Sequence, residues 1–165
     1  MNEQQYLNAI FTPIESRLGE YLKNDLQVSV QKMERLDNPP SIMLKNFTVN
    51  IGLGGAISVL FVVSYDENVI VQLANAFAYG DIAEDEVDEV RESVASEIAN
   101  IVLGNSIPYF PDGGRGVTMT PPLVIHEAKS ISTGKHSKIA TVVIDTDWGQ
   151  IAVSIVWPYN LMASK

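Results

Sequence analysis

The strongest constraint on the fold is a two-residue alternation in the segment 43–53. Its odd-numbered positions are mostly apolar, and most of its even-numbered positions are small or polar. Strand side chains alternate between the two faces of a sheet, so this pattern predicts a strand with one buried face. Gly54-Gly55 then predicts a turn, and the more apolar segment 56–65 predicts a second strand that pairs with the first as a hairpin.

The last part of the chain has a second hairpin pattern. The strand-like segments 138–145 and 150–158 flank Thr146-Asp147-Trp148-Gly149, which is typical of a hairpin turn. The strand-like segment 117–125 is interrupted by Pro121-Pro122. Because proline cannot donate a hydrogen bond within a sheet, we expect an edge strand or a bulge there.

Three segments have helical periodicity. In the segment 2–23 the apolar residues are three or four apart, and Pro13 predicts either a kink or a helix that begins near Thr12. A short helix is expected after Asp66 and a longer one over 85–103. The segment 26–33 has a mixed pattern and is counted as a further strand. The order helix, about three strands, two helices, about three strands predicts an α+β fold, with an antiparallel sheet and helices packed on one face. It also suggests two similar halves, although the residues themselves show no repeat.

The composition limits the possible functions. A chain of 165 residues, 46% of them apolar, favours a single domain over 1–165. The net charge of −9 disfavours nucleic acid and anionic membranes as partners. The absence of cysteine excludes disulfides and thiolate metal ligands. The longest apolar run, 56–63, is too short to span a bilayer and the N-terminus lacks a secretory signal, so we expect a cytoplasmic protein.

The helix predicted over 85–103 carries the candidate chemistry. Acidic residues dominate its start, where they face the positive end of the helix dipole. At the spacing of a helix, one apolar stripe is predicted to be buried: Val87, Val90, Val94, Ile98 and Ile101. A second stripe beside it holds Ser93, Glu97, Asn100 and Gly104. A carboxylate and a carboxamide thus lie one turn apart between small residues, although spacing alone does not distinguish them from a solvated helix face.

Other candidate sites have weaker support. His126 and His136 have no clustered acid at metal-ligand spacing, so they are predicted to be ordinary strand or surface histidines. The glycines in 52–55 join two strands with no following helix, which argues against a phosphate-binding loop. The chain contains no Gly-x-Ser-x-Gly nucleophile motif. None of these patterns predicts a metal site or a hydrolase triad.

The stretch 93–105 resembles the active-site helix of the CheC/CheX/FliY family of chemotaxis phosphatases. The family pattern is Asp or Ser, three residues, Glu, two residues, Asn, and Pro after about 22 more residues. Ser93, Glu97 and Asn100 match in type and spacing, whereas Pro122 follows after 21 residues, one short of the pattern. In the first helix, Leu18 stands where a second Asn would be. The chain therefore resembles the CheX-like members, which have one site and are typically homodimers.

This resemblance implies a CheC-like fold and a single CheX-like phosphatase domain that acts on a phosphorylated, CheY-like response regulator. Asn100 would position the attacking water, Glu97 would pair with the regulator's lysine, and Ser93 and Pro122 would support them. The chain would need no cofactor of its own, because Mg²⁺ is expected in the partner regulator. The alternative is a non-catalytic interaction domain of the same fold, as in the flagellar switch, that docks a regulator without turnover.

Overall fold

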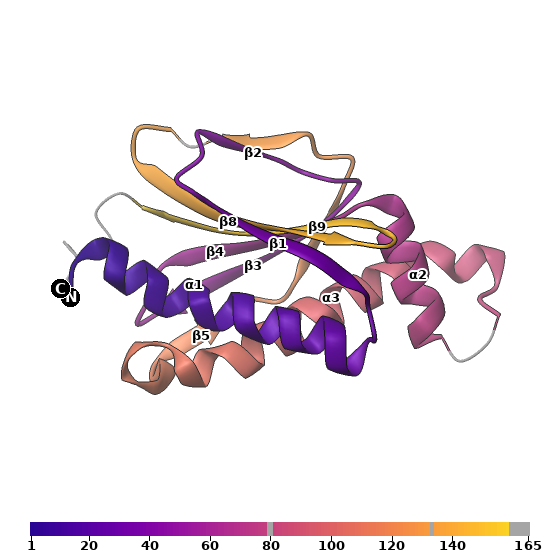
Figure 1. Cartoon of the computed structure of the whole chain (residues 1–165), viewed down its shortest axis with the longest axis horizontal. Coiled ribbons are helices and arrows are strands. Elements are labelled where there is room, and N and C mark those ends of the chain that lie inside the picture. Colours follow the sequence, from indigo (N-terminus) through magenta and orange to yellow (C-terminus); the bar gives the residue numbers. More distant parts are fainter. Residues whose placement is uncertain (79–80, 133, 159–165) are drawn as a thin grey trace.

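The computed structural model describes residues 1–78, 81–132 and 134–158. Within these ranges, seven strands form one antiparallel sheet in the order β1-β8-β9-β4-β3-β5, and β6 also pairs with β3. The strands of this sheet are β1 (Val30–Asp37), β3 (Phe47–Gly55), β4 (Val59–Tyr65), β5 (Val117–Met119), β6 (Leu123–His126), β8 (Ser137–Thr146) and β9 (Gly149–Pro158). The helices are α1 (Glu3–Glu20), α2 (Glu67–Phe77) and α3 (Val87–Ser106). Figure 1 shows α1 and α3 along one side of the sheet, which confirms the predicted fold class.

The two predicted hairpins are both present. β3 pairs with β4, and β8 pairs with β9. The predicted turn at Gly54-Gly55 is wrong, because both glycines are the last residues of β3 and pair with β5, and the connection to β4 is formed by residues 56–58. The segment interrupted by Pro121-Pro122 forms the two short strands β5 and β6, both at the β3 edge of the sheet. The sheet order is symmetric about its centre, where β4 and β9 are neighbours. Outward from each of them comes the preceding strand of the same half (β3 or β8), and then the first strand of the other half (β5 or β1). The two similar halves are therefore confirmed as a pseudo-twofold arrangement.

The core lies between the sheet and the helices. In β3, Phe47, Val49, Ile51 and Leu53 are buried, as the alternation predicts. The helix side of the core is supplied largely by buried residues of α1, which are Leu7, Ile10, Phe11, Ile14 and Leu18. Each large apolar side chain that leaves water in this way contributes about 1.5–3 kcal/mol.

The other face of the sheet has a cover that the sequence patterns did not predict. The short strands β2 (Ser41–Met43) and β7 (Ser130–Ser132) form a separate antiparallel pair, and β2 lies on the side away from α1 and α3 (Figure 1). Ile42 in β2 is buried. The hydroxyls of Thr141 and Ser154, both buried, are 2.8 Å apart.

The N-terminal helix begins earlier than the Thr12 alternative. A capping box fixes its start, because the Gln5 amide N–H donates to the Asn2 side chain (2.8 Å) and the Asn2 N–H donates to the Gln5 side chain (2.9 Å). Pro13 lies inside the helix. The start near Thr12 is therefore wrong, since the cap and the packing of the first turns outweigh the backbone hydrogen bond that proline removes. None of the described helices is both long and apolar enough to cross a membrane.

Candidate active site

The buried face of α3 differs from the predicted stripe. Its buried residues are Val94, Ala95, Ile98, Ala99, Val102, Leu103 and Ser106. Of the predicted stripe, Val94 and Ile98 are buried, but Val87, Val90 and Ile101 are only half-buried. The centre of the face is instead lined by two alanines and Val102, because small side chains allow a helix to approach its neighbours closely. The positions of the large apolar residues therefore did not predict which side of α3 faces the core.

This shift places the candidate residues on the outer side of α3. At about 100° per residue, Glu97 and Asn100 fall roughly opposite Ala95 and Val102. Glu97 is exposed and Asn100 is half-buried. Neither side chain makes a hydrogen bond or an ion pair with any residue that the structure describes. Their polar atoms are thus available to a second molecule.

The residues one helical turn before and one turn after this pair have small side chains. Ser93, one turn before Glu97, is exposed. Gly104 lies one turn after Asn100 on the same side, and a Cβ added there would meet no atom within 4 Å. The packing of this chain therefore does not require glycine at position 104. Open space lies beside Asn100 on the helix face that carries the candidate site.

Pro122 is half-buried and directly precedes β6, which contacts α3. A contact between side chains joins β6 and α3: the ring nitrogen Nε2 of His126, in β6, is 2.8 Å from Oε1 of Glu92, in α3. The His126 ring also packs edge-on against Phe47, with 4.6 Å between the ring centres. The Glu92–His126 pair was not predicted, since the two residues are 34 positions apart and no local pattern links them. The supporting role of Pro122 stays a prediction.

The corresponding turn of α1 is used for packing. Leu18 is buried, so it does not occupy an outward position like that of Asn100. The Glu15 carboxylate is 3.2 Å from the Arg35 guanidinium, which also pairs with Asp37 at 2.9 Å and lies 4.9 Å from the centre of the Phe11 ring. Burial raises the pKa of the Glu15 carboxyl, although Arg35 opposes this shift. This part of α1 is therefore tied to the sheet and presents no second site.

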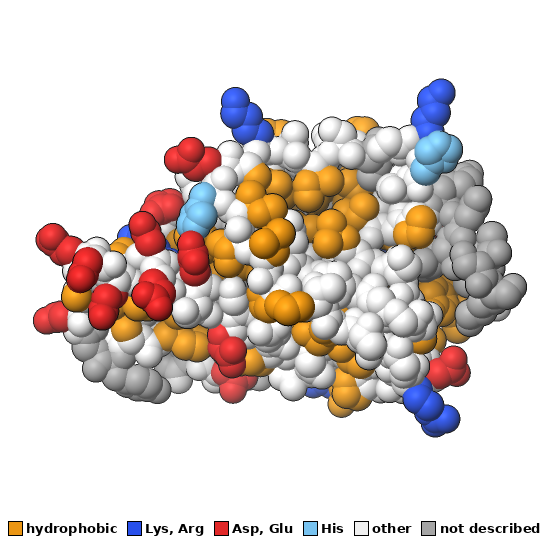
Figure 2. Space-filling view, turned by 180° about the vertical axis from the view of Figure 1, so that it is seen from behind, with side chains coloured by type: hydrophobic (Ala, Val, Ile, Leu, Met, Phe, Trp, Pro, Cys, Tyr) orange, Lys and Arg blue, Asp and Glu red, His pale blue; other side chains and the backbone are white. Residues whose placement is uncertain are grey.

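Negative charge surrounds the beginning of α3. Figure 2 shows acidic side chains gathered at one end of the molecule, where the exposed residues Glu84, Asp85, Glu86, Asp88 and Glu89 lead into α3. The nearby Arg91 is paired with Glu67 at 3.0 Å. Such a surface complements a positively charged partner and repels an acidic one.

In the described part of the chain, no group of three or more His, Asp or Glu side chains is arranged to hold a metal ion. The site as described is therefore a polar pair on a helix surface. It can donate and accept hydrogen bonds and can form one ion pair.

Comparisons with known proteins place the chain in a family and match its fold. A family model described as "Chemotaxis phosphatase CheX" matches residues 47–145. The CheX structure from Desulfovibrio desulfuricans is 15% identical, with a TM-score of 0.75, over 88% of this chain and 97% of that one. A CheC-like protein from a Shewanella species is 20% identical, with a TM-score of 0.68, over 94% and 98% of the two chains.

A third solved structure contains a partner protein. It is the CheX–CheY–BeF3–Mg²⁺ complex from Borrelia burgdorferi, which is 18% identical to this chain with a TM-score of 0.69. The match covers 90% of this chain and 97% of that one. At these identities the solved structures establish a shared fold. No curated protein sequence matches this chain.

Proposed function

Because the chain belongs to the CheX family of chemotaxis phosphatases, we propose that it dephosphorylates a CheY-like response regulator through Glu97 and Asn100. One observation carries this proposal above all. The two side chains lie on the side of α3 opposite its buried face and have no bonding partner among the described residues. The Borrelia relative of the same fold is found in a complex with CheY, which supports a partner of this kind.

Asn100 would act by positioning water. The acyl phosphate of a response regulator is already reactive, so the phosphatase needs only to hold a water in line with the bond that breaks. The Asn100 carboxamide can donate one hydrogen bond and accept another, which fixes the direction of a water without any change of charge. Water oxygen then bonds to phosphorus, the bond to the regulator's aspartate breaks, and inorganic phosphate leaves. No covalent intermediate forms on this chain.

Glu97 would hold the two proteins in register. Its exposed carboxylate pairs with no cation among the residues that the structure describes, and it can pair with the lysine of the regulator's phosphorylation site. Mg²⁺ belongs to the regulator in this scheme, where it neutralises phosphoryl charge. Ser93 and Gly104 bring little bulk to the same face, so the helix can enter a concave site.

The decay of a CheY-like receiver domain phosphorylated with acetyl phosphate tests this proposal. Asn100→Ala should lower the stimulated rate by about 100- to 1000-fold, the usual loss for a well-placed polar group, and should leave the unfolding midpoint unchanged. Glu97→Ala should mainly raise KM. Asn75→Ala is the matched control, because Asn75 is an exposed asparagine on α2, away from the candidate pair. Wild-type turnover by Asn100→Ala would overturn the proposal.

The same experiment addresses the non-catalytic alternative. A wild-type chain that binds the phosphorylated receiver but leaves its decay unchanged would be a docking domain, and the phosphatase proposal would be wrong. The homodimer expected for a CheX-like member stays a prediction, which size-exclusion chromatography with light scattering measures directly.

A further inference from the structure

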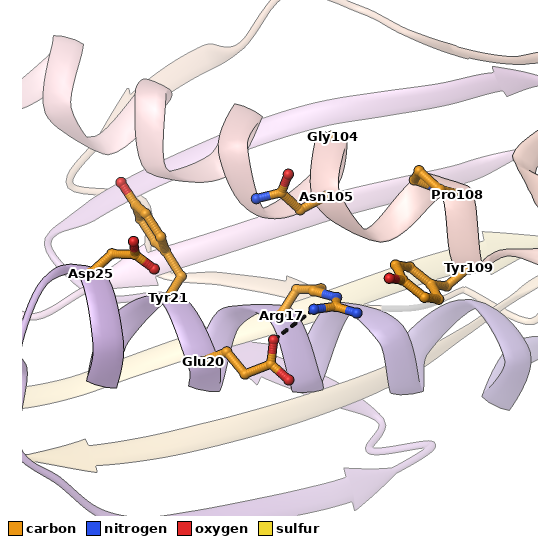
Figure 3. Close-up of a pocket in the computed structure, with 8 residues that line it drawn as sticks. All are labelled: Arg17, Glu20, Tyr21, Asp25, Gly104, Asn105, Pro108 and Tyr109. Carbon is orange, nitrogen blue, oxygen red and sulfur yellow. Dashed lines mark hydrogen bonds and ion pairs between the residues drawn. The ribbon is translucent and has the colours of Figure 1, made fainter.

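A groove lies between the C-terminal part of α1 with the segment that follows it and the C-terminal part of α3 with the segment that follows it (Figure 3). Its volume is about 480 Å³. The polar and aromatic side chains in its lining are Arg17, Glu20, Tyr21, Asp25, Asn105 and Tyr109. Gly104 also borders the groove. Since Gly104 shares the outward face of α3 with Asn100, the groove is continuous with the surface on which the regulator would dock.

Arg17 already interacts with two other residues of the groove. One of its guanidinium nitrogens is 2.7 Å from a Glu20 carboxylate oxygen, an ion pair drawn in Figure 3. Its guanidinium carbon is 4.3 Å from the centre of the Tyr109 ring. Asp25, by contrast, makes no ion pair or hydrogen bond with the residues described. The groove therefore holds a carboxylate whose charge is not matched by a cation.

Two carboxylates act on one phenol at this end of the groove. Burial raises the pKa of Tyr21, and the charges of Asp25 and then Glu97 raise it further. Tyr21 and Asp25 both line the groove and lie in the helical segment Tyr21–Asp25 that follows α1. Burial raises the pKa of Tyr65, and Tyr21 raises it further. The buried Tyr65 hydroxyl has no hydrogen-bond partner among the described residues.

We propose that this groove receives a lysine or arginine side chain of the response regulator docked on α3, with Asp25 as its ion-pair partner. The inference rests on the proposed function and extends it, because Glu97 would bind one cation of the regulator and Asp25 a second. No ion pair within the described part of the chain has to break, since Asp25 makes none there. The missing side chain at Gly104 leaves the approach from Asn100 open.

Steady-state dephosphorylation of the same acetyl-phosphate-treated receiver domain tests the groove. Asp25→Asn should raise KM by about 3- to 10-fold, as expected for the loss of a partly desolvated ion pair, and Asp25→Lys should raise it by more than about 10-fold. The value of kcat should not change, because Asp25 touches no reacting atom. The difference in KM between the Asp25 variants and the wild type should become smaller as NaCl is added, since salt screens the ion pair. Glu34→Gln is the matched control, an equal loss of charge on the exposed edge strand β1.

Asn100→Ala, assayed in parallel, separates the two proposals. If Asn100→Ala loses turnover while both Asp25 variants keep the wild-type KM, the groove inference is wrong and the phosphatase function stands. If Asn100→Ala turns over like wild type, the phosphatase function and the groove inference both fail. An unchanged unfolding midpoint for Asp25→Asn is expected as well, because Asp25 makes no ion pair or hydrogen bond with a described residue that the substitution would remove.

Discussion

The sharpest quantitative predictions concern Gly104. A methyl group at this position should raise the stability of the fold, whereas a large side chain there should weaken docking of the regulator. Gly104 lies inside α3, and a Cβ placed on it would meet no atom within 4 Å. Glycine in a helix is less stable than alanine by about 0.5–1 kcal/mol, since it loses more backbone freedom on folding. Gly104→Ala should therefore stabilise the chain by that amount. For a protein of this size, this corresponds to a rise in Tm of about 1–4 °C.

Calorimetry or urea unfolding of Gly104→Ala measures this stability. Gly114→Ala is the contrasting control, because Gly114 has a φ of +66° and its Cβ would lie 2.2 Å from the Ile107 carbonyl oxygen. That variant should be strongly destabilised. If Gly104→Ala had a lower Tm than wild type, the conclusion that nothing in this chain requires glycine at position 104 would be wrong.

Docking should respond to size at the same position. Gly104→Leu should fold, since the space around its Cβ is open, but its side chain would project beside Asn100 and the groove. We expect KM for the phosphorylated receiver domain to rise by at least about 10-fold, the effect of about 1.4 kcal/mol in binding. A wild-type KM for Gly104→Leu would show that the regulator does not approach this face of α3.

Two further predictions concern the sheet. Thr141→Val leaves the buried Ser154 hydroxyl unpaired and should lower the free energy of unfolding in urea by about 1–3 kcal/mol. The double variant Thr141→Val with Ser154→Ala should regain most of that stability, because no hydroxyl is then left unpaired. Equal losses in the single and the double variant would exclude a direct pair. Arg35→Met removes the cation beside Glu15 and should cost about 1–3 kcal/mol near pH 7. Burial raises the pKa of the Glu15 carboxyl, so protonation of Glu15 favours the folded state. The stability that Arg35→Met loses should therefore shrink as the pH falls toward 4.5 and Glu15 becomes neutral. A loss of stability that does not depend on pH would contradict the role of Glu15.

Much of the fold could be predicted from local patterns. The alternation in 43–53 and the turn Thr146–Gly149 led to the correct hairpins, since two-residue periodicity reports which face of a strand is buried. The motif formed by Glu97 and Asn100 could also be found in the sequence, because positions three apart share one side of a helix whatever that helix packs against. Resemblance to the CheC/CheX/FliY family supplied the function, which spacing alone did not.

The orientation of α3 needed the tertiary structure. The half-buried apolar residues Val90 and Ile101 flank its buried face on one side, so the predicted stripe was displaced toward them from the centre of that face. Packing against the sheet and the other helices selected the side with Ala95 and Ala99. That choice placed Glu97 and Asn100 opposite the core, instead of beside it.

Residue order along the chain thus determined the helices and the long strands, the acidic surface and the identity of the candidate pair, because each depends on neighbours within a few positions. Only the folded structure decided that Glu92 meets His126, that Arg35 is paired with Glu15, and that Asp25 lies in a groove next to Gly104. These contacts join residues from separate elements, and their distances depend on how α1 and α3 lie on the sheet. Packing of whole elements sets that geometry, and no short segment encodes it.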